Sequence, residues 1–276
     1  EVDTSYAVPG VGRFRVNVYR QRGSLAIVMR TIPLDIPTFE QLGCPEAVKL
    51  LADKERGMVI IVGAAGNGKS STLAAMVGYL NRTRPIHVIT IEDPIEFLHK
   101  DEMASISQRE VGIDTPSFAI ALRAALRQDP DVILVGEIRD QETMDIALKA
   151  AETGHLVLTT LHTPDVTRTI NRMIALFDLA DPTELRDRIA NSLQGIVAQR
   201  LLPKVDGEGL VLASEVLVMT GTARETIRRP ENNPPLKEVM EKGVHPYGMQ
   251  TFPMDLKRLM QLGVISKDVA RAAAGF

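Results

Sequence analysis

The stretch GAAGNGKS at residues 63–70 limits the possible folds more than any other part of the chain. It fits the pattern G-x-x-x-x-G-K-[ST], follows the apolar run MVIIV at residues 58–62, and precedes a helix-like segment. A buried strand, a glycine loop and a helix in this order form a loop that binds phosphate groups. A glycine turn that binds nothing is the weaker alternative, because pattern and surroundings would both have to arise by chance.

The parts of this loop have separate predicted roles. Glycines let backbone N–H groups curl around phosphates, and the positive N-terminal end of the following helix adds to the attraction. Lys69 would reach the terminal phosphates, and the Ser70 hydroxyl would coordinate magnesium. The predicted nucleotide-binding residues of the loop are Gly63, Ala64, Ala65, Gly66, Asn67, Gly68, Lys69, Ser70 and Ser71.

The centre of the chain alternates apolar strands with helices. Strands are expected at residues 58–62, 87–91, 131–135 and 155–161, with helices at about 45–54 and from the glycine loop to about 81. Continuous apolar strands that alternate with helices predict a parallel sheet covered on both faces, so residues 46–220 should form an α/β domain. From about residue 221, short helical segments broken by Pro and Gly predict a small helical tail.

A different pattern comes before this domain. Residues 14–19 and 25–29 alternate apolar and polar side chains around Gln-Arg-Gly-Ser, which predicts a hairpin of half-buried antiparallel strands. Three prolines, Pro33, Pro37 and Pro45, then predict a linker at 33–45. The sequence starts at Glu1 inside a strand-like segment, so we expect residues 1–32 to be the remainder of a domain that begins earlier.

Two acidic motifs follow predicted strands. TIEDPIEF, residues 90–97, places Glu92, Asp93 and Glu96 at the carboxyl edge of the sheet, where open α/β folds bind their ligands. A carboxylate there could orient or deprotonate an attacking water or hold magnesium through water, and a solvated acidic loop is the alternative. VILVGEIRD, residues 132–140, brings Glu137 to the same edge, with Gly136 where an Asp is usual.

Arginines and histidines complete the candidate site. Arg139 and Asp140 could simply pair with each other or with solvent. In AETGHLVLTTLHT, His155 starts a strand and is more simply explained as a structural residue, whereas His162 follows the strand at the ligand edge. The hairpin carries arginines that could form only a solvated face, or could clamp phosphates and offset transition-state charge: Arg13, Arg15, Arg20, Arg22 and Arg30.

Taken in order, GAAGNGKSS, TIEDPIEF, LVGEIRD and AETGHLVLTTLHT resemble the motifs of the secretion and type IV pilus motor ATPases, closest to the PilT/PilU-type pilus retraction ATPases. The resemblance runs from RFRVN at Arg13 to YGMQTF at Tyr247. It implies a PAS-like N-terminal domain, of which 1–32 is a part, and a RecA-like P-loop ATPase domain at 46–276 that includes the helical tail. It also implies a cytoplasmic hexamer at the inner membrane face that works with a membrane platform protein.

The same resemblance implies roles for single residues. Glu96 would be the general base and Glu137 the Walker B acid, although the sequence alone would also allow the reverse. The implied catalytic residues are Glu96, Glu137, Arg15, Arg30 and His162, the implied magnesium ligands are Ser70 and Glu137, directly or through water, and His155 would belong to the ATP site.

Two departures bear on the branch of the family. AQRLLPKVDGEGLVLASEV has no cysteine, whereas pilus extension and type II secretion relatives carry a four-cysteine metal-binding insertion after the equivalent segment. This difference favours retraction. TARETIRRP keeps only scattered matches to the AIRNLIRE-type motif of PilT-like proteins, which weakens the same assignment. Ala64 and Asn67 replace the Pro and Ser common in the family, but backbone N–H groups do the binding there.

Composition restricts the alternatives. The formal net charge of -3 and 4% aromatic residues offer little for a nucleic-acid translocase, so we expect no nucleic-acid partner. A nucleotide-gated module that hydrolyses little is disfavoured by the intact Lys69, Glu96 and Glu137. The chain has no apolar run of 18 residues, so membrane contact is expected only through partners. Cys44, the single cysteine, fits a reducing compartment.

Overall fold

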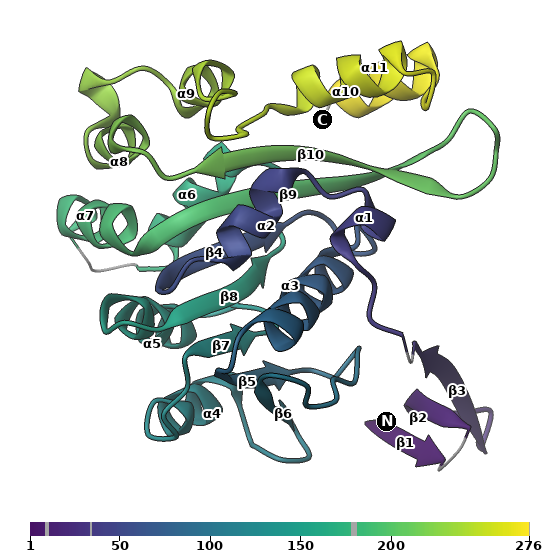
Figure 1. Ribbon diagram of the computed structural model, residues 1–276. Helices are drawn as coiled ribbons and strands as arrows, with labels where there is room; N and C mark the ends of the chain where they lie inside the picture. The colour runs from purple at the N-terminus through teal and green to yellow at the C-terminus, as the bar shows by residue number, and fades with distance from the viewer. Residues whose placement is uncertain (9–10, 34, 178–180, 276) are drawn as a thin grey trace.

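The computed structural model describes residues 1–8, 11–33, 35–177 and 181–275. Within these ranges the strands form a three-stranded sheet near the N-terminus and a seven-stranded sheet in the main body (Figure 1). The small sheet contains β1 (Val2–Val8), β2 (Gly12–Gln21) and β3 (Ser24–Ile32). The large sheet contains β4 (Gly57–Val62), β5 (His87–Glu92), β6 (Ser105–Glu110), β7 (Val132–Val135), β8 (Leu156–Leu161), β9 (Leu193–Pro203) and β10 (Leu210–Val218).

The large sheet is mostly parallel, which confirms the predicted α/β class. Its strand order is β10-β9-β4-β8-β7-β5-β6, and only the edge strand β10 runs antiparallel to its neighbour. The predicted strands correspond to β4, β5, β7 and β8, which are buried along their whole length or nearly so. Three strands of this sheet were not predicted. They are β9 and β10 at one edge and the polar strand β6 at the other edge.

Helices cover both faces of this sheet, because alternate residues of each strand point to opposite sides. One face packs against α1 (Phe39–Leu42), α2 (Glu46–Ala52) and α3 (Lys69–Thr83), which meet Val59 and Ile61 of β4. The other face packs against α4 (Phe118–Ala125), α5 (Gln141–Glu152), α6 (Val166–Ala175) and α7 (Pro182–Ser192), which share a core with Met58 and Ile60. The core therefore fixes β4 between two apolar layers.

The predicted helical tail is present. It comprises α8 (Gly221–Arg228), the short 3-10 helix η1 (Pro230–Asn232), α9 (Leu236–Lys242), α10 (Phe252–Gln261) and α11 (Lys267–Ala274), and it lies along the β9–β10 edge (Figure 1). Leu256, Leu259 and Ile265 form a small core there with Leu202 and Ala213 of the two strands. Within the described ranges, no helix is long and apolar enough to span a membrane.

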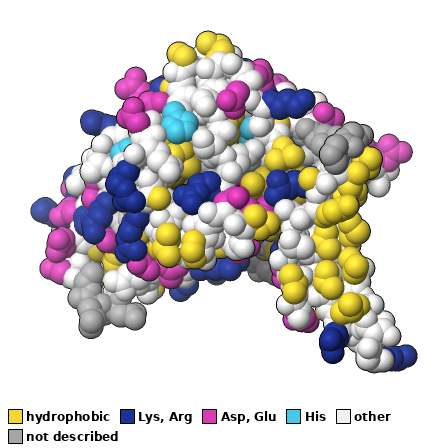
Figure 2. Space-filling model, turned by 90° about the horizontal axis from the view of Figure 1, so that it is seen from below, with side chains coloured by type: hydrophobic (Ala, Val, Ile, Leu, Met, Phe, Trp, Pro, Cys, Tyr) yellow, Lys and Arg dark blue, Asp and Glu magenta, His cyan; other side chains and the backbone are white. Residues whose placement is uncertain are grey.

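The N-terminal hairpin is confirmed as β2–β3, with β1 added on the other side of β2. Its turn is closed by Arg22 and Gly23, both at positive φ, between the paired residues Gln21 and Ser24. The expected half-burial of β3 is wrong for this chain: Leu25, Ile27 and Met29 are 71%, 61% and 49% exposed. Figure 2 shows the apolar stripe on this sheet, which no described element covers.

Between the two sheets, residue 33 and residues 35–45 are more structured than the prolines suggest. Thr38 caps α1 by accepting a hydrogen bond from the Gln41 N–H, and the Gln41 side chain accepts one from the Thr38 N–H. Phe39 is buried, with its ring 5.6 Å from that of Tyr79 on α3. The second half of the connection therefore packs on the main body, and the division of the chain into domains stays a prediction.

Candidate active site

Residues 63–68 form a glycine loop between β4 and α3. Gly68 is the N-cap of α3 with φ of 77°, a conformation that favours glycine. No side chain caps this helix, and its first turn contains no acidic residue. The first N–H groups of α3 and its positive dipole end therefore point out of the helix toward the cavity, as an anion site requires.

Lys69 is the charged centre of the loop. Its Nζ donates hydrogen bonds to Gly63 O at 2.9 Å and Ala64 O at 3.0 Å, and the residue is 8% exposed. Burial lowers the pKa of Lys69, and the nearby carboxylates of Glu137 and Glu96 oppose that shift. The lysine is thus held where it faces both acidic motifs.

A strand far along the sequence anchors the loop. The Leu201 N–H on β9 donates to Asn67 Oδ1 at 2.9 Å, so the residue that departs from the family pattern has a structural role. A Cβ on Gly63, which has φ of 146°, would lie 2.6 Å from the Gln199 carbonyl oxygen. Only glycine therefore permits this contact between loop and strand, which the sequence did not reveal.

Asn67→Ala should lower the free energy of unfolding by about 1–2 kcal/mol, because it leaves the half-buried Leu201 N–H without its acceptor. Asn67→Asp is the matched control, since it retains an oxygen at the same position. Denaturant unfolding of the three proteins measures the difference. Equal stability of Asn67→Ala and wild type would show that the contact contributes nothing.

A cavity of about 370 Å³ joins the loop to the strand ends and to the N-terminal sheet. Its walls come from the loop, from the carboxyl ends of β5, β7 and β8, and from β2 and β3. Among the predicted site residues it is lined by Ala65, Gly66, Lys69, Ser70, Glu96, Glu137, His162, Arg15 and Arg30. The fold thus brings together residues from every predicted motif.

Glu137 lies just after β7, and its carboxylate contacts two other residues that line this cavity. Its side chain is 14% exposed, accepts a hydrogen bond from Arg139, and lies 3.3 Å from His162 Nε2. The hydrogen bond to Glu137 raises the pKa of Arg139. Asp140 instead caps α5 by accepting a hydrogen bond from the Thr143 N–H at 2.8 Å, so Arg139 and Asp140 do not pair with each other.

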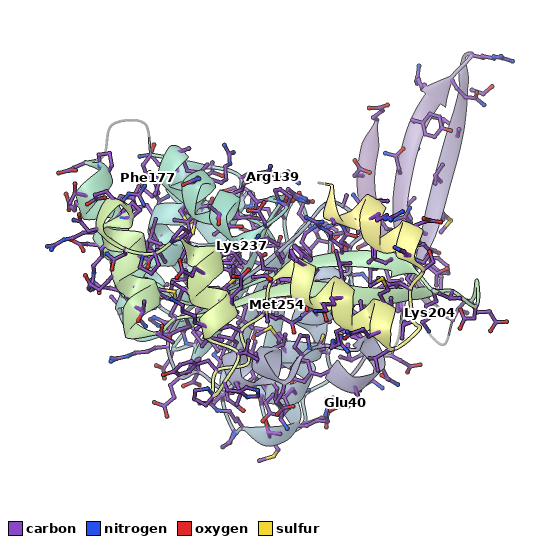
Figure 3. All side chains as sticks on the ribbon, turned by 90° about the horizontal axis from the view of Figure 1, so that it is seen from above. Glu40, Arg139, Phe177, Lys204, Lys237 and Met254 are labelled. Atoms are coloured by element: carbon purple, nitrogen blue, oxygen red, sulfur yellow. The ribbon has the colours of Figure 1, made fainter. Side chains whose placement is uncertain are left out.

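Arg139 also links the two acidic motifs. Its Nη1 lies 4.0 Å from Asp93 Oδ2, while its other nitrogen contacts Glu137. Figure 3 labels Arg139 on the side of the core from which the N-terminal sheet projects. The sequence left the role of Arg139 open, and the structure places it between the acids.

The surroundings of position 136 explain why this motif has glycine where an aspartate is usual. A Cβ at this position would lie 3.3 Å from Ile91 O and 3.4 Å from Glu92 Cα on the neighbouring strand β5. The Gly136 N–H donates to Ile91 O at 2.8 Å, and Thr160 Oγ1 donates to Gly136 O at 2.7 Å. The strand is therefore bonded closely on both sides, and a side chain would force it away from β5.

The three acids of TIEDPIEF differ in their surroundings. Glu92 accepts hydrogen bonds from Thr90 Oγ1 at 2.6 Å and Gln108 Nε2 at 3.1 Å, and burial raises its pKa against those bonds. Glu96 is exposed and lines the cavity. Both acids line the cavity, but the Glu92 carboxylate is bonded to neighbouring side chains, whereas the Glu96 side chain is exposed toward a ligand.

His155 lies at the opposite end of the sheet. It precedes Leu156, which pairs with Gly57 at the start of β4, whereas the glycine loop follows the end of β4. Its Nδ1 lies 3.0 Å from Ala150 O, and it lines a separate cavity with Thr153 and Arg84. The prediction that His155 belongs to the ATP site is wrong for the site that this chain forms. His155 precedes β8, whereas His162 follows β8 at the edge where the glycine loop lies.

The hairpin arginines also separate into groups. Arg15 and Arg30 are directly paired across β2 and β3, are exposed, and line the cavity. Arg20 and Arg22 lie near the turn, outside the cavity lining. Arg13 contacts Glu110 of the main body instead. The geometry therefore supports the choice of Arg15 and Arg30 as phosphate-facing residues.

The donors suit magnesium. Within the described ranges no group of three or more His, Cys, Asp or Glu is arranged to hold a metal. Magnesium commonly takes only one or two protein oxygens and completes its shell with water and phosphate oxygens. The Ser70 hydroxyl and the Glu137 carboxylate line the same cavity and supply oxygens of that kind.

Residues 12–229 match the family described as Type II/IV secretion system protein. The chain belongs to this family. PilT of Pseudomonas aeruginosa, a type IV pilus retraction ATPase, is 46% identical over 274 residues, which make up 99% of this chain and 79% of that protein. The twitching motility protein of Neisseria gonorrhoeae is 44% identical over 274 residues, 99% of this chain and 73% of that protein.

A solved structure agrees with this fold. The crystal structure of the pilus retraction motor PilT with bound ADP superposes with a TM-score of 0.91 at 47% identity, covering 99% of this chain and 77% of that one. The resemblance inferred from the four motifs is therefore confirmed, as is the RecA-like fold class.

Proposed function

We propose that this protein hydrolyses ATP with magnesium and works as a motor of the type IV pilus machinery that powers pilus retraction. The observation that carries the proposal is one cavity that contains Lys69, Glu96 and Glu137 together with Arg15 and Arg30 of the N-terminal sheet. Such an assembly of phosphate-binding, acidic and guanidinium groups is suited to phosphoryl transfer. The names of the similar proteins support the same activity.

Each group has a role in ATP hydrolysis. The backbone N–H groups of residues 63–70 and Lys69 hold the phosphates, and Glu96, exposed in the cavity, orients and deprotonates the attacking water. Ser70 and Glu137 would hold magnesium, which offsets phosphate charge when bound. His162, 3.3 Å from Glu137, is placed to respond to the γ-phosphate through that acid.

Two features favour retraction over the other motors of the family. β9 ends at Pro203 and β10 begins at Leu210, so residues 204–209 connect them without space for the four-cysteine insertion of pilus extension and type II secretion relatives. The similar proteins named above are a retraction ATPase and a twitching motility protein. We therefore place the chain in the retraction branch.

The working form that we propose is a homo-oligomer, a hexameric ring in the cytoplasm at the inner membrane face. It would transmit force to an inner-membrane platform protein of the pilus machine. Arg15 and Arg30 reach the cavity only while the N-terminal sheet lies against the main body, so assembly that favours this closed arrangement should speed hydrolysis.

ATP hydrolysis measured beside oligomeric mass tests the proposal. The wild-type protein should hydrolyse ATP only with magnesium, at a rate per chain that rises with the assembled fraction. Arg15→Ala and Arg30→Ala should each lower kcat by about 10³-fold or more if they act as arginine fingers. We expect kcat to fall because each substitution removes a positive charge from the place where negative charge develops in the transition state.

Arg20→Ala is the matched control, because Arg20 lies on the same strand as Arg15 and outside the cavity lining. Equal kcat values for Arg15→Ala and Arg20→Ala would show that the N-terminal sheet does not contribute Arg15 to catalysis. Absence of magnesium-dependent hydrolysis in the assembled wild type would overturn the proposed activity itself.

A further inference from the structure

The loop that presents Glu96 is held by side chains of the edge strand β6. The Ile95 N–H donates to Glu110 Oε2 at 3.2 Å, and Gln108 Nε2 donates to Phe97 O at 2.9 Å. These two bonds fix the backbone immediately before and after Glu96. The Glu96 N–H itself donates to Glu92 Oε2 at 3.4 Å. The position of the candidate base therefore depends on Glu92 and also on Glu110 and Gln108, two residues of a strand that the sequence did not predict.

Glu110 is shared with the N-terminal sheet. Arg13 Nη2 donates to Glu110 Oε2 at 2.6 Å, the same oxygen that accepts from Ile95. The side chains of Arg13 and Glu110 are 18% and 3% exposed, and Arg13 Nη2 also donates to Ser5 Oγ at 2.8 Å. A buried carboxylate depends on such an ionised partner, because losing one member of the pair leaves an uncompensated charge.

Arg13 stands on β2 two residues before Arg15, and residues two apart in a strand point to the same face. Arg15 in turn pairs with Arg30 on β3. Arg13, which binds the main body, and Arg15, which lines the cavity, therefore lie on the same face of β2. One contact positions both the arginines and, through Glu110, the loop that holds Glu96.

We propose that the Arg13–Glu110 ion pair is the joint through which the N-terminal sheet sets the position of Glu96, with the docked arrangement as the productive one. The inference rests on the proposed function. Arg13 does not line the cavity, so it is a positioning residue that acts through Glu110 and the Ile95 N–H. When the sheet lifts away, the Glu110 carboxylate loses its cation and turns toward water, and its bond to the Ile95 N–H weakens.

Arg13→Gln in the full chain tests this joint. It should lower kcat by about 10- to 100-fold, the range expected when a reacting group is misplaced by about 1 Å. The affinity for a fluorescent ADP analogue should stay within about twofold of wild type, because the phosphate loop itself is unchanged. Arg13→Lys, which retains the charge, should recover most of the lost rate.

Hydrogen–deuterium exchange of peptides that contain Ile95 supplies a readout that does not need catalysis. Exchange at Ile95 should be faster in Arg13→Gln and in Glu110→Ala, which both loosen the acceptor of this N–H. Glu110→Gln keeps an oxygen acceptor in a side chain of the same shape and should show a smaller change. Arg20→Gln is the matched control, since it removes an exposed charge from the same strand.

The proposal is overturned if Arg13→Gln matches Arg20→Gln in both kcat and Ile95 exchange. An increase in kcat would also overturn it, because the pair would then restrain the enzyme instead of aligning it. A parallel loss of ADP affinity and of thermal stability would assign Arg13 to general folding. If the wild type hydrolyses no ATP, the proposed function fails, while the exchange experiment still decides whether the joint exists.

Discussion

Replacing Lys69 with alanine is expected to weaken ATP and ADP binding by about 30- to 4,000-fold, because truncating one member of a buried charged pair costs about 2–5 kcal/mol. Lys69 is 8% exposed and is the ammonium group placed between the loop carbonyls and the two acids. Isothermal calorimetry with ADP and with a non-hydrolysable ATP analogue measures the loss. The effect should be the largest of any single substitution on nucleotide affinity.

Lys100→Ala is the control for this experiment. Lys100 is an exposed lysine that follows the TIEDPIEF loop and lies outside the cavity lining. Lys100→Ala changes the net charge by the same amount as Lys69→Ala and should leave the affinity for ATP and ADP unchanged. If Lys69→Ala instead keeps wild-type affinity and loses only turnover, the lysine acts in the transition state and not in ground-state binding.

Replacing Glu96 or Glu137 with glutamine should remove turnover while binding survives. Loss of a general base typically costs about 10²- to 10⁴-fold in rate, so Glu96→Gln should lower kcat by that amount at a normal magnesium requirement. Glu137→Gln should also lower kcat, and it should raise the magnesium concentration needed for half-maximal nucleotide binding. Rates and binding measured across a magnesium titration separate the two acids.

Their surroundings favour this division of labour. Glu96 is exposed in the cavity, whereas Glu137 is 14% exposed and contacts both Arg139 and His162. If Glu96→Gln raised the magnesium requirement and Glu137→Gln left it unchanged, Glu96 would be the magnesium ligand and Glu137 the general base. Loss of affinity in Glu137→Gln as large as that in Lys69→Ala would contradict both assignments.

The sequence predicted the parts of the fold that rest on local patterns. The strands β4, β5, β7 and β8 are continuous apolar runs because helices cover both their faces. β6 reads SISQRE, since it is an edge strand paired only with β5, and such a polar run gives no strand signal. The exposed apolar residues of β3 look like a covered strand in sequence, because periodicity does not reveal whether a covering element is present.

The site was predictable to the same extent. The glycine loop, Glu96, Glu137 and His162 follow strand ends at one edge of a parallel sheet, so topology alone brings them together. Contacts between distant segments leave no local signal: Arg13 and Glu110 are 97 positions apart. His155 shows the reverse error, because a resemblance transferred a role to a residue that topology places at the other end of its strand.

The anchor of the glycine loop has an evolutionary consequence. Asn67 and Leu201 are 134 positions apart, and their contact joins a side-chain oxygen to a main-chain N–H. For this bond, residue 67 has to supply an acceptor, whereas position 201 only has to supply an N–H, which every amino acid except proline has. This bond therefore restricts the amino acid at position 67 and not the one at position 201, so by itself it should produce no covariation between the two positions.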